Sequence, residues 1–240
     1  MSKIKLNYKN GFIKGIPIGL GYLPVSFTFG LMAAESGLPV WLVIFTSLSN
    51  ITSAGQFAGV NLIVAGAGYM EIALTTLVIN LRYMLMSLAL SQKLEQKIPM
   101  WKRLIFGFGI TDEVFAVASA EVHKISAEYM FGLISAPIAG WTIGTALGAC
   151  ASGILPSVLR NAMGIALYTM FIAIIIPPAK KSKPIVVVIL LSVFITCVMR
   201  YISWFDFISS GFQTILATVF AAGIGAVLFP PEEEKDESIC

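Results

Sequence analysis

Charged residues are scarce in this sequence: they make up 12% of its 240 residues, about half the roughly 25% of a soluble domain. Hydrophobic residues account for 57% of the chain, and its mean hydropathy is +0.86. So few charges cannot cover a water-facing surface, which excludes a soluble enzyme and a nucleic-acid-binding domain. The high hydrophobicity also excludes intrinsic disorder. We therefore expect an all-α integral membrane protein.

Residues that hold metals and cofactors are also few. Cys150, Cys197 and Cys240 are scattered and form no Cys-x-x-Cys pair, so neither a disulfide framework nor a thiolate metal site is predicted. The single histidine, His123, lies beside Lys124 in a polar stretch typical of a solvated loop. Gly-x-Ser-x-Gly, His-Glu-x-x-His and P-loop motifs are missing. We expect no cofactor, no metal and no enzymatic activity.

Long apolar segments fill most of the chain. A transmembrane helix needs about 20 mainly apolar residues. Eight candidate segments meet this requirement: 11–34, 40–65, 71–91, 103–121, 129–152, 157–178, 185–204 and 211–229. We interpret 1–10 as an N-terminal cytoplasmic segment, 11–229 as one transmembrane domain and 230–240 as an acidic, disordered tail.

The basic residues constrain the topology, since cytoplasmic loops are enriched in Lys and Arg. They gather at 3–14, 93–103 and 180–183. Eight full crossings from a cytoplasmic N-terminus would place the second cluster outside. If one of the first two segments and one of segments five and six do not cross, all three clusters lie inside, and Lys124 is the clearest exception in an outer loop. We therefore predict six full crossings, two broken or re-entrant segments and cytoplasmic termini.

Residues that interrupt helices occur where such breaks are expected. Segment one contains Pro17 and Pro24, and segment two contains a polar run from Ser47 to Gln56. Non-helical backbone at membrane depth survives only where protein or water satisfies it.

The two halves of the chain, 11–121 and 129–229, resemble each other. The Gly-Leu-Pro sequence at 37–39 is echoed by Gly-Ile-Leu-Pro at 153–156, with the two prolines 117 residues apart, and the Arg-Tyr pair at Arg82 recurs 118 residues later at Arg200. With three crossings in each half, the second half would be inverted, as in many secondary transporters.

Arg82 is the first candidate functional residue, because ionisable side chains inside spanning segments are costly. It lies near the middle of segment three, with Asn80 two positions earlier. Arg82 is either a structural strut paired with a carboxylate or a cation that binds a substrate carboxylate.

Asp112 and Glu113 are the acidic counterparts in segment four. A buried carboxylate can exchange a proton at physiological pH, which suits proton coupling. The alternative is that one of them neutralises Arg82 or Arg200, and both roles are compatible.

Gly-x-x-x-Gly series begin at Gly11, Gly55 and Gly140. Small residues at this spacing let helices approach closely in lipid, so we expect tight packing within the chain or against a partner.

Taken in order, five motifs resemble the AzlC family, the large subunit of bacterial branched-chain amino acid exporters. They are Gly-Ile-Pro at 15–17 with Leu-Pro at 23–24, Phe-Gly at 29–30, Ser-Ala-Gly-Gln-Phe at 53–57, Asn-Leu-Arg-Tyr-Met-Leu-Met-Ser at 80–87 and Thr-Asp-Glu-Val-Phe-Ala at 111–116. The resemblance covers nearly the whole chain, from Gly15 to about Phe220. The chain departs from the family pattern at Tyr83, where His is common, and at Thr52 and Ser53.

The resemblance implies a two-component carrier in the bacterial cytoplasmic membrane. A small AzlD-like hydrophobic subunit would be its partner, and the pair would export branched-chain or related hydrophobic amino acids, coupled to protons.

On this reading Arg82, steadied by Asn80, binds the substrate carboxylate or forms the main buried ion pair, and Gln56, Gly55 and Ser53 contact polar groups of the substrate. Asp112 or Glu113 carries the coupling proton or meets the substrate amine. The alternatives are a channel or uniporter for small neutral solutes, and a membrane scaffold for a partner that transports nothing.

Overall fold

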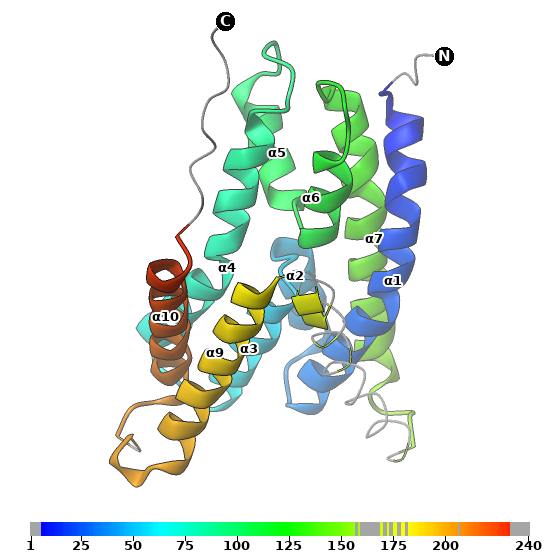
Figure 1. Ribbon diagram of the computed structural model, residues 1–240. Coiled ribbons are helices and arrows are strands. Elements are labelled where there is room, and N and C mark those ends of the chain that lie inside the picture. Colours follow the sequence, from blue (N-terminus) through cyan, green and yellow to red (C-terminus); the bar gives the residue numbers. More distant parts are fainter. Residues whose placement is uncertain are drawn as a thin grey trace, which may run out of the picture.

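The computed structural model describes residues 6–156, 182–205 and 207–230, together with positions 158, 169, 172, 175, 176, 179 and 180 (Figure 1). Within this part of the chain, five helices are long and apolar enough to cross a membrane: α1 (Tyr8–Glu35), α4 (Tyr69–Ser91), α7 (Ala127–Ala151), α9 (Lys183–Tyr201) and α10 (Ser210–Leu228). The shorter helices are α2 (Val40–Ser49), α3 (Ala54–Val64), α5 (Met100–Gly109), α6 (Asp112–Ser119) and the 3₁₀ turn η1 (Ser203–Phe205). The predicted all-α membrane class is confirmed.

The helices α1 and α7 lie side by side over nearly their whole length (Figure 1). Glycines let their backbones touch: a Cβ on Gly140 would lie 2.3 Å from the carbonyl oxygen of Gly19, and one on Gly148 would lie 2.0 Å from that of Phe27. Two of the predicted Gly-x-x-x-Gly series therefore pack against each other inside the chain. Pro17 and Pro24 lie within α1, which stays one continuous helix.

A helical hairpin, α2–α3, follows α1 and turns back halfway through the bundle. Gly55 contacts Asn80 and Gly59 contacts Thr76, so α3 runs antiparallel to α4 and ends beside the start of α4. The ten residues of α2 span about 15 Å, half of the roughly 30 Å hydrocarbon core. The predicted break in segment two is confirmed, and it falls between Asn50 and Ser53.

A second hairpin, α5–α6, enters the bundle from the other end (Figure 1). Its two flanking loops are hydrogen-bonded to each other: the Glu95 N–H donates to the Ile125 carbonyl at 3.1 Å, and the Ile125 N–H donates to the Lys93 carbonyl at 2.9 Å. Both ends of the hairpin therefore lie at one end of the bundle. The prediction that segment 103–121 crosses the membrane is wrong, because the helix breaks at Ile110.

The sequence contains a signal for this break. Gly107 and Gly109 are poor helix formers, and Thr111 then starts a new helix as its N-cap, with its side chain accepting from the Val114 N–H. Segment five, predicted as a candidate for the second break, is the continuous helix α7. Most of segment six lies outside the described residues, as does the acidic tail after Pro230.

The loops at 92–99 and 120–126 and the start of α1 lie together, and we call this the basic end of the bundle. Lys14 pairs with Glu121, and the Lys124 ammonium donates to the Gln92 carbonyl at 2.7 Å. The prediction that Lys124 lies in an outer loop, on the other side of the membrane from Lys93, is therefore wrong. If segments two and four are the re-entrant ones, the other six segments cross the membrane, and all three basic clusters still lie on the same side of it. This topology stays a prediction.

The direction of the first helix in each half contradicts the predicted inversion. Gly11 packs against Tyr129, and Gly148 against Phe27, so α1 and α7 run in the same direction. These helices would be equivalent in the repeat, and inverted halves would make them antiparallel. The rest of the comparison depends largely on 157–181, so the repeat itself stays a prediction.

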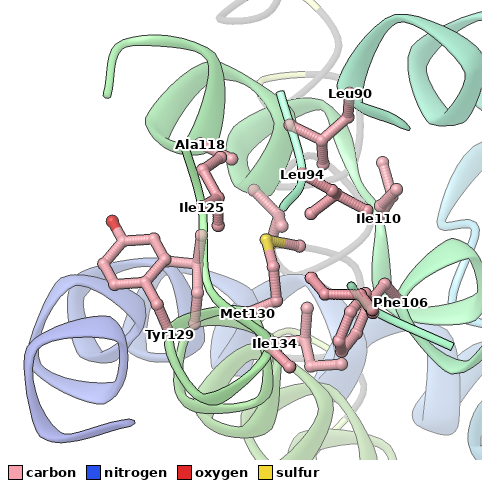
Figure 2. Packing of buried hydrophobic residues seen from close by; sticks show 13 residues of the cluster. Leu90, Leu94, Phe106, Ile110, Ala118, Ile125, Tyr129, Met130 and Ile134 are labelled. Carbon is pink, nitrogen blue, oxygen red and sulfur yellow. The ribbon is translucent and has the colours of Figure 1, made fainter. Parts of the chain in front are cut away.

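Each hairpin is held by its own apolar cluster. Figure 2 shows the one beneath α5–α6, where Phe106, Ile110 and Ile125 pack against Met130 and Ile134 of α7. The α2–α3 hairpin packs through Val43, Ile51 and Phe57 against Phe29 and Trp141. The common support α7 thus fixes both hairpin tips near the middle of the bundle.

Candidate functional site

A cavity of about 640 Å³ lies where the two hairpin tips approach each other, which is within the usual range of about 300–1,000 Å³ for a ligand site. Both tips, the middle of α4 and parts of α1, α7 and α10 line it. The lining residues are Tyr22, Ile51, Ser53, Ala54, Val78, Ile79, Leu81, Arg82, Tyr83, Leu85, Thr111, Asp112, Glu113, Trp141, Ile175, Thr218, Val219 and Ala222. Most of this surface is apolar, and its charges come from α4 and α6.

An ion pair joins α4 to the α5–α6 tip within this cavity. The Nη1 atom of Arg82 lies 2.7 Å from Oδ2 of Asp112, and the two side chains are 39% and 31% exposed. Asp112 is also the first residue of α6, where the positive end of the helix dipole favours a carboxylate. Of the two alternatives for Arg82, the structure shows the pairing with a carboxylate, and the partial exposure leaves the pair open to a ligand.

Tyr83 connects the same guanidinium to the other hairpin. The Nη2 atom of Arg82 donates to the Tyr83 hydroxyl at 3.0 Å, and that hydroxyl donates to the Thr52 carbonyl at 3.2 Å. The guanidinium carbon also lies 4.9 Å from the Tyr83 ring centroid, a cation–π distance. The sequence marks Tyr83 only as a departure from the family's histidine, so this role was not predicted.

Glu113 is held by α1 and not by Arg82. The Tyr22 hydroxyl hydrogen-bonds the Glu113 carboxylate and lies 2.7 Å from Oγ1 of Thr111. The Tyr22 ring packs edge-on against Trp141, with 5.5 Å between ring centroids. The two adjacent carboxylates therefore have different partners. Sequence reasoning missed Tyr22, since a tyrosine in an apolar segment resembles any interfacial or packing residue.

The α2–α3 tip presents the start of a helix to the cavity. Ser53 precedes α3 with φ 47°, an uncommon backbone conformation for a residue other than glycine, and no side chain caps this helix. Ser53 and Ala54 both line the cavity. The N-terminus of α3 thus carries a positive dipole end toward the space beside Arg82.

Gly55, Gln56 and Asn80, also predicted to bind substrate, lie behind the cavity wall. A Cβ on Gly55 would lie 2.6 Å from Oδ1 of Asn80, so glycine allows the hairpin tip to approach α4. The Gln56 side chain is 1% exposed and donates to Ser47 at 3.0 Å, which in turn bonds Thr145 of α7 at 2.7 Å. These residues shape the tip, whereas Ser53, Arg82, Asp112 and Glu113 face the cavity.

These features define a helical integral membrane protein in which two half-length hairpins meet at a charged, largely apolar cavity. The family profile described as AzlC protein matches residues 17–155, which include both hairpins and α4. The chain belongs to the AzlC family.

Its relatives are membrane proteins. The chain is 28% identical to inner membrane protein YgaZ of Escherichia coli strain K12 over 187 residues, which are 75% of this chain and 76% of that protein. It is 31% identical to an uncharacterized membrane protein of Archaeoglobus fulgidus over 177 residues, covering 72% and 76% of the two chains. No solved structure matches the chain. This kinship is consistent with a transport role in the membrane.

Proposed function

We propose that the protein is a secondary transporter that exports branched-chain or related hydrophobic amino acids, as the large subunit of a two-component, proton-coupled carrier. The observation that carries this proposal is a largely apolar cavity with one open Arg–Asp pair between two helix N-termini. An amino acid of this class is complementary to such a cavity, because it has two opposite charges at one end and an aliphatic group at the other.

Arg82 and the N-terminus of α3 are suited to the substrate carboxylate. The guanidinium already contacts Asp112 and Tyr83, and its Nε has no hydrogen-bond partner among the described residues. A guanidinium has five donors in a planar fork, so it can hold a second carboxylate beside Asp112. The substrate ammonium would then contact Asp112 in place of part of the Arg82 guanidinium.

The aliphatic side chain would lie against the apolar wall. Val78, Leu81 and Leu85 on α4 face Val219 and Ala222 on α10 across the cavity. Burying apolar area stabilises binding by roughly 25 cal/mol per Å², so a branched side chain would bind more tightly than alanine's methyl group.

Glu113 is suited to carry the coupling proton. It lines the cavity, yet its partner is the neutral Tyr22 and not a cation. Asp112 is held instead by Arg82.

The small AzlD-like subunit rests on the family resemblance alone. The glycine series that favoured a partner surface are occupied within the chain, because Gly11, Gly15 and Gly19 pack on α7 and Gly55 packs on α4. We place the basic end in the cytoplasm, following the distribution of Lys and Arg.

Transport assays with and without the small subunit test the proposal. Cells preloaded with labelled leucine should lose it faster when both subunits are produced, and unlabelled leucine outside should accelerate the loss by exchange. Glu113→Gln should keep exchange and lose efflux driven by a pH gradient, while Asp112→Asn should weaken both. Flux without counterflow would indicate a channel, and no flux of any amino acid would contradict the proposal.

Labelling from outside the cell tests the orientation. A cysteine at Lys97 or Lys124 should be protected from an impermeant thiol reagent, and one at Gly68 should react. Reaction at position 124 but not 68 would reverse the orientation.

A further inference from the structure

The central cavity continues into a groove between α1 and α6. Tyr22 and Glu113 line both the cavity and a neighbouring hollow of about 350 Å³, which also touches Pro17 and Gly21. Pro17 in turn lines a further hollow of about 560 Å³ that reaches Lys14 and Glu121 at the basic end. Because neighbouring spaces share lining residues, they follow one another from the hairpin tips to the basic end. We call the two outer hollows the α1–α6 groove.

The two faces of α1 differ in a way that keeps this groove open. One face packs its glycines onto the α7 backbone, whereas a Cβ on Gly21 would have no atom within 4 Å. Proline has no N–H, so Pro17 leaves the Ile13 carbonyl without its helical donor, and both residues line the groove. The groove thus combines free space with a backbone acceptor.

The contact between Tyr22 and Glu113 lies where the groove meets the cavity, since both residues line both spaces. The Tyr22 hydroxyl on α1 bonds Glu113 and Thr111 at the tip of α5–α6. At the other end of the groove, Lys14 and Glu121 place opposite charges at its mouth, where the Lys14 side chain is 46% exposed.

We propose that the α1–α6 groove is the route by which the amino acid passes between the basic end and the cavity, and that the Tyr22–Glu113 contact is its gate. This inference rests on the proposed transport function for the identity of the solute. The route itself can be tested by accessibility, without any transported substrate.

The first test measures thiol reaction in a full-length variant whose three native cysteines are serine. A water-soluble thiol reagent is added to membrane vesicles with the basic end outward. Gly21→Cys, in the groove, should react readily. Thr218→Cys, in the cavity, should react slowly, and Tyr22→Phe should speed its reaction about tenfold by removing the hydrogen bond that closes the gate. The phenylalanine keeps the ring contact with Trp141.

The second test blocks the groove. Gly21→Trp should slow both the labelling of Thr218→Cys and leucine exchange about tenfold or more, since the side chain fills the space there. Gly223→Trp is the matched control, because Gly223 on α10 also has no atom within 4 Å of a Cβ. It should leave both rates unchanged. If Gly21→Trp does not accumulate, attaching a bulky maleimide to folded Gly21→Cys gives the same block.

The results distinguish the route from the proposed function. Unchanged labelling of Thr218→Cys after both Tyr22→Phe and the block at position 21 would overturn the route, even with normal leucine transport. Gate-dependent labelling without flux of any amino acid would leave the route standing and contradict only the solute.

Discussion

The two hairpins have the same architecture and opposite chemistry. Each consists of two half-length helices that turn back near the middle of the bundle, and each rests on α7. The α2–α3 tip is neutral and begins an uncapped helix at the unusual backbone of Ser53, whereas the α5–α6 tip is capped by Thr111 and carries two carboxylates. One tip therefore suits an anion and the other a cation. Arg82 lies between them and contacts both through Tyr83 and Asp112.

Removing Arg82 should have the largest effect, because its charge joins the two tips through Asp112 and Tyr83. Arg82→Ala should abolish leucine exchange, while Arg82→Lys keeps the charge but loses the planar fork and should weaken binding. A fully buried pair would cost about 3–5 kcal/mol to break, and the partial exposure of this one predicts a smaller loss. Protein level and exchange should be measured together. Wild-type exchange by Arg82→Ala would contradict the site.

Moving the neutral tip should have the next largest effect. Gly55→Ala would place a Cβ 2.6 Å from both the Asn80 amide and the Thr52 hydroxyl, so these side chains or the tip must shift. A displacement of the tip by about 1 Å can reduce the rate about 10²-fold. Gly59→Ala, one turn later on α3, meets nothing closer than 3.4 Å and should behave as wild type. Equal exchange rates in the two variants would show that the tip position does not matter.

Gln56 tests whether a residue behind the wall acts on stability alone. Gln56→Leu removes its bond to Ser47, at a cost of about 1–3 kcal/mol, while Ser47 keeps its bond to Thr145. The melting temperature should fall and the KM for leucine should stay unchanged. Ser53→Ala, in the cavity wall, should change KM more than stability. A raised KM in Gln56→Leu would place Gln56 in direct contact with the substrate.

The smallest effect concerns Glu121, outside the spanning segments at the basic end. Burial raises the pKa of this carboxyl, but hydrogen bonds from Lys14 and Tyr129 and the Lys14 charge lower it more, so the pKa is below its ordinary value of 4.5. A depressed pKa stabilises the fold above pH 4.5 and loses that contribution as the pH falls through the folded value. Glu121→Gln should cost less than about 1 kcal/mol at pH 7, and less at acidic pH. If Glu121→Gln instead lost more unfolding free energy as the pH falls, a lowered pKa of Glu121 would be contradicted.

The sequence predicts one hairpin better than the other. The run from Ser47 to Gln56 is visibly polar, so its break could be predicted, whereas apolar residues continue through 103–121 and conceal the break at Ile110. Arg82 and Asp112 could be found because charges are rare in spanning segments. Tyr22 and Tyr83 could not, since their hydroxyl partners come from other helices. The burial of Gln56 likewise depends on α7, because its partner Ser47 bonds Thr145, far along the sequence.

The most direct test of a site built from both hairpin tips is competition by two analogues that each lack one charged group of leucine. Binding of labelled leucine to the purified protein is measured against isopentylamine, which lacks the carboxylate, and 4-methylpentanoate, which lacks the amine. If one tip binds each charged group, each analogue should compete at least about tenfold more weakly than leucine, because one of the two tips then lacks its charged partner on the ligand. In the Asp112→Asn variant, the difference in affinity between leucine and 4-methylpentanoate should become smaller, whereas the difference between leucine and isopentylamine should not. Competition by either analogue as strong as that of leucine would contradict a site built from both hairpin tips.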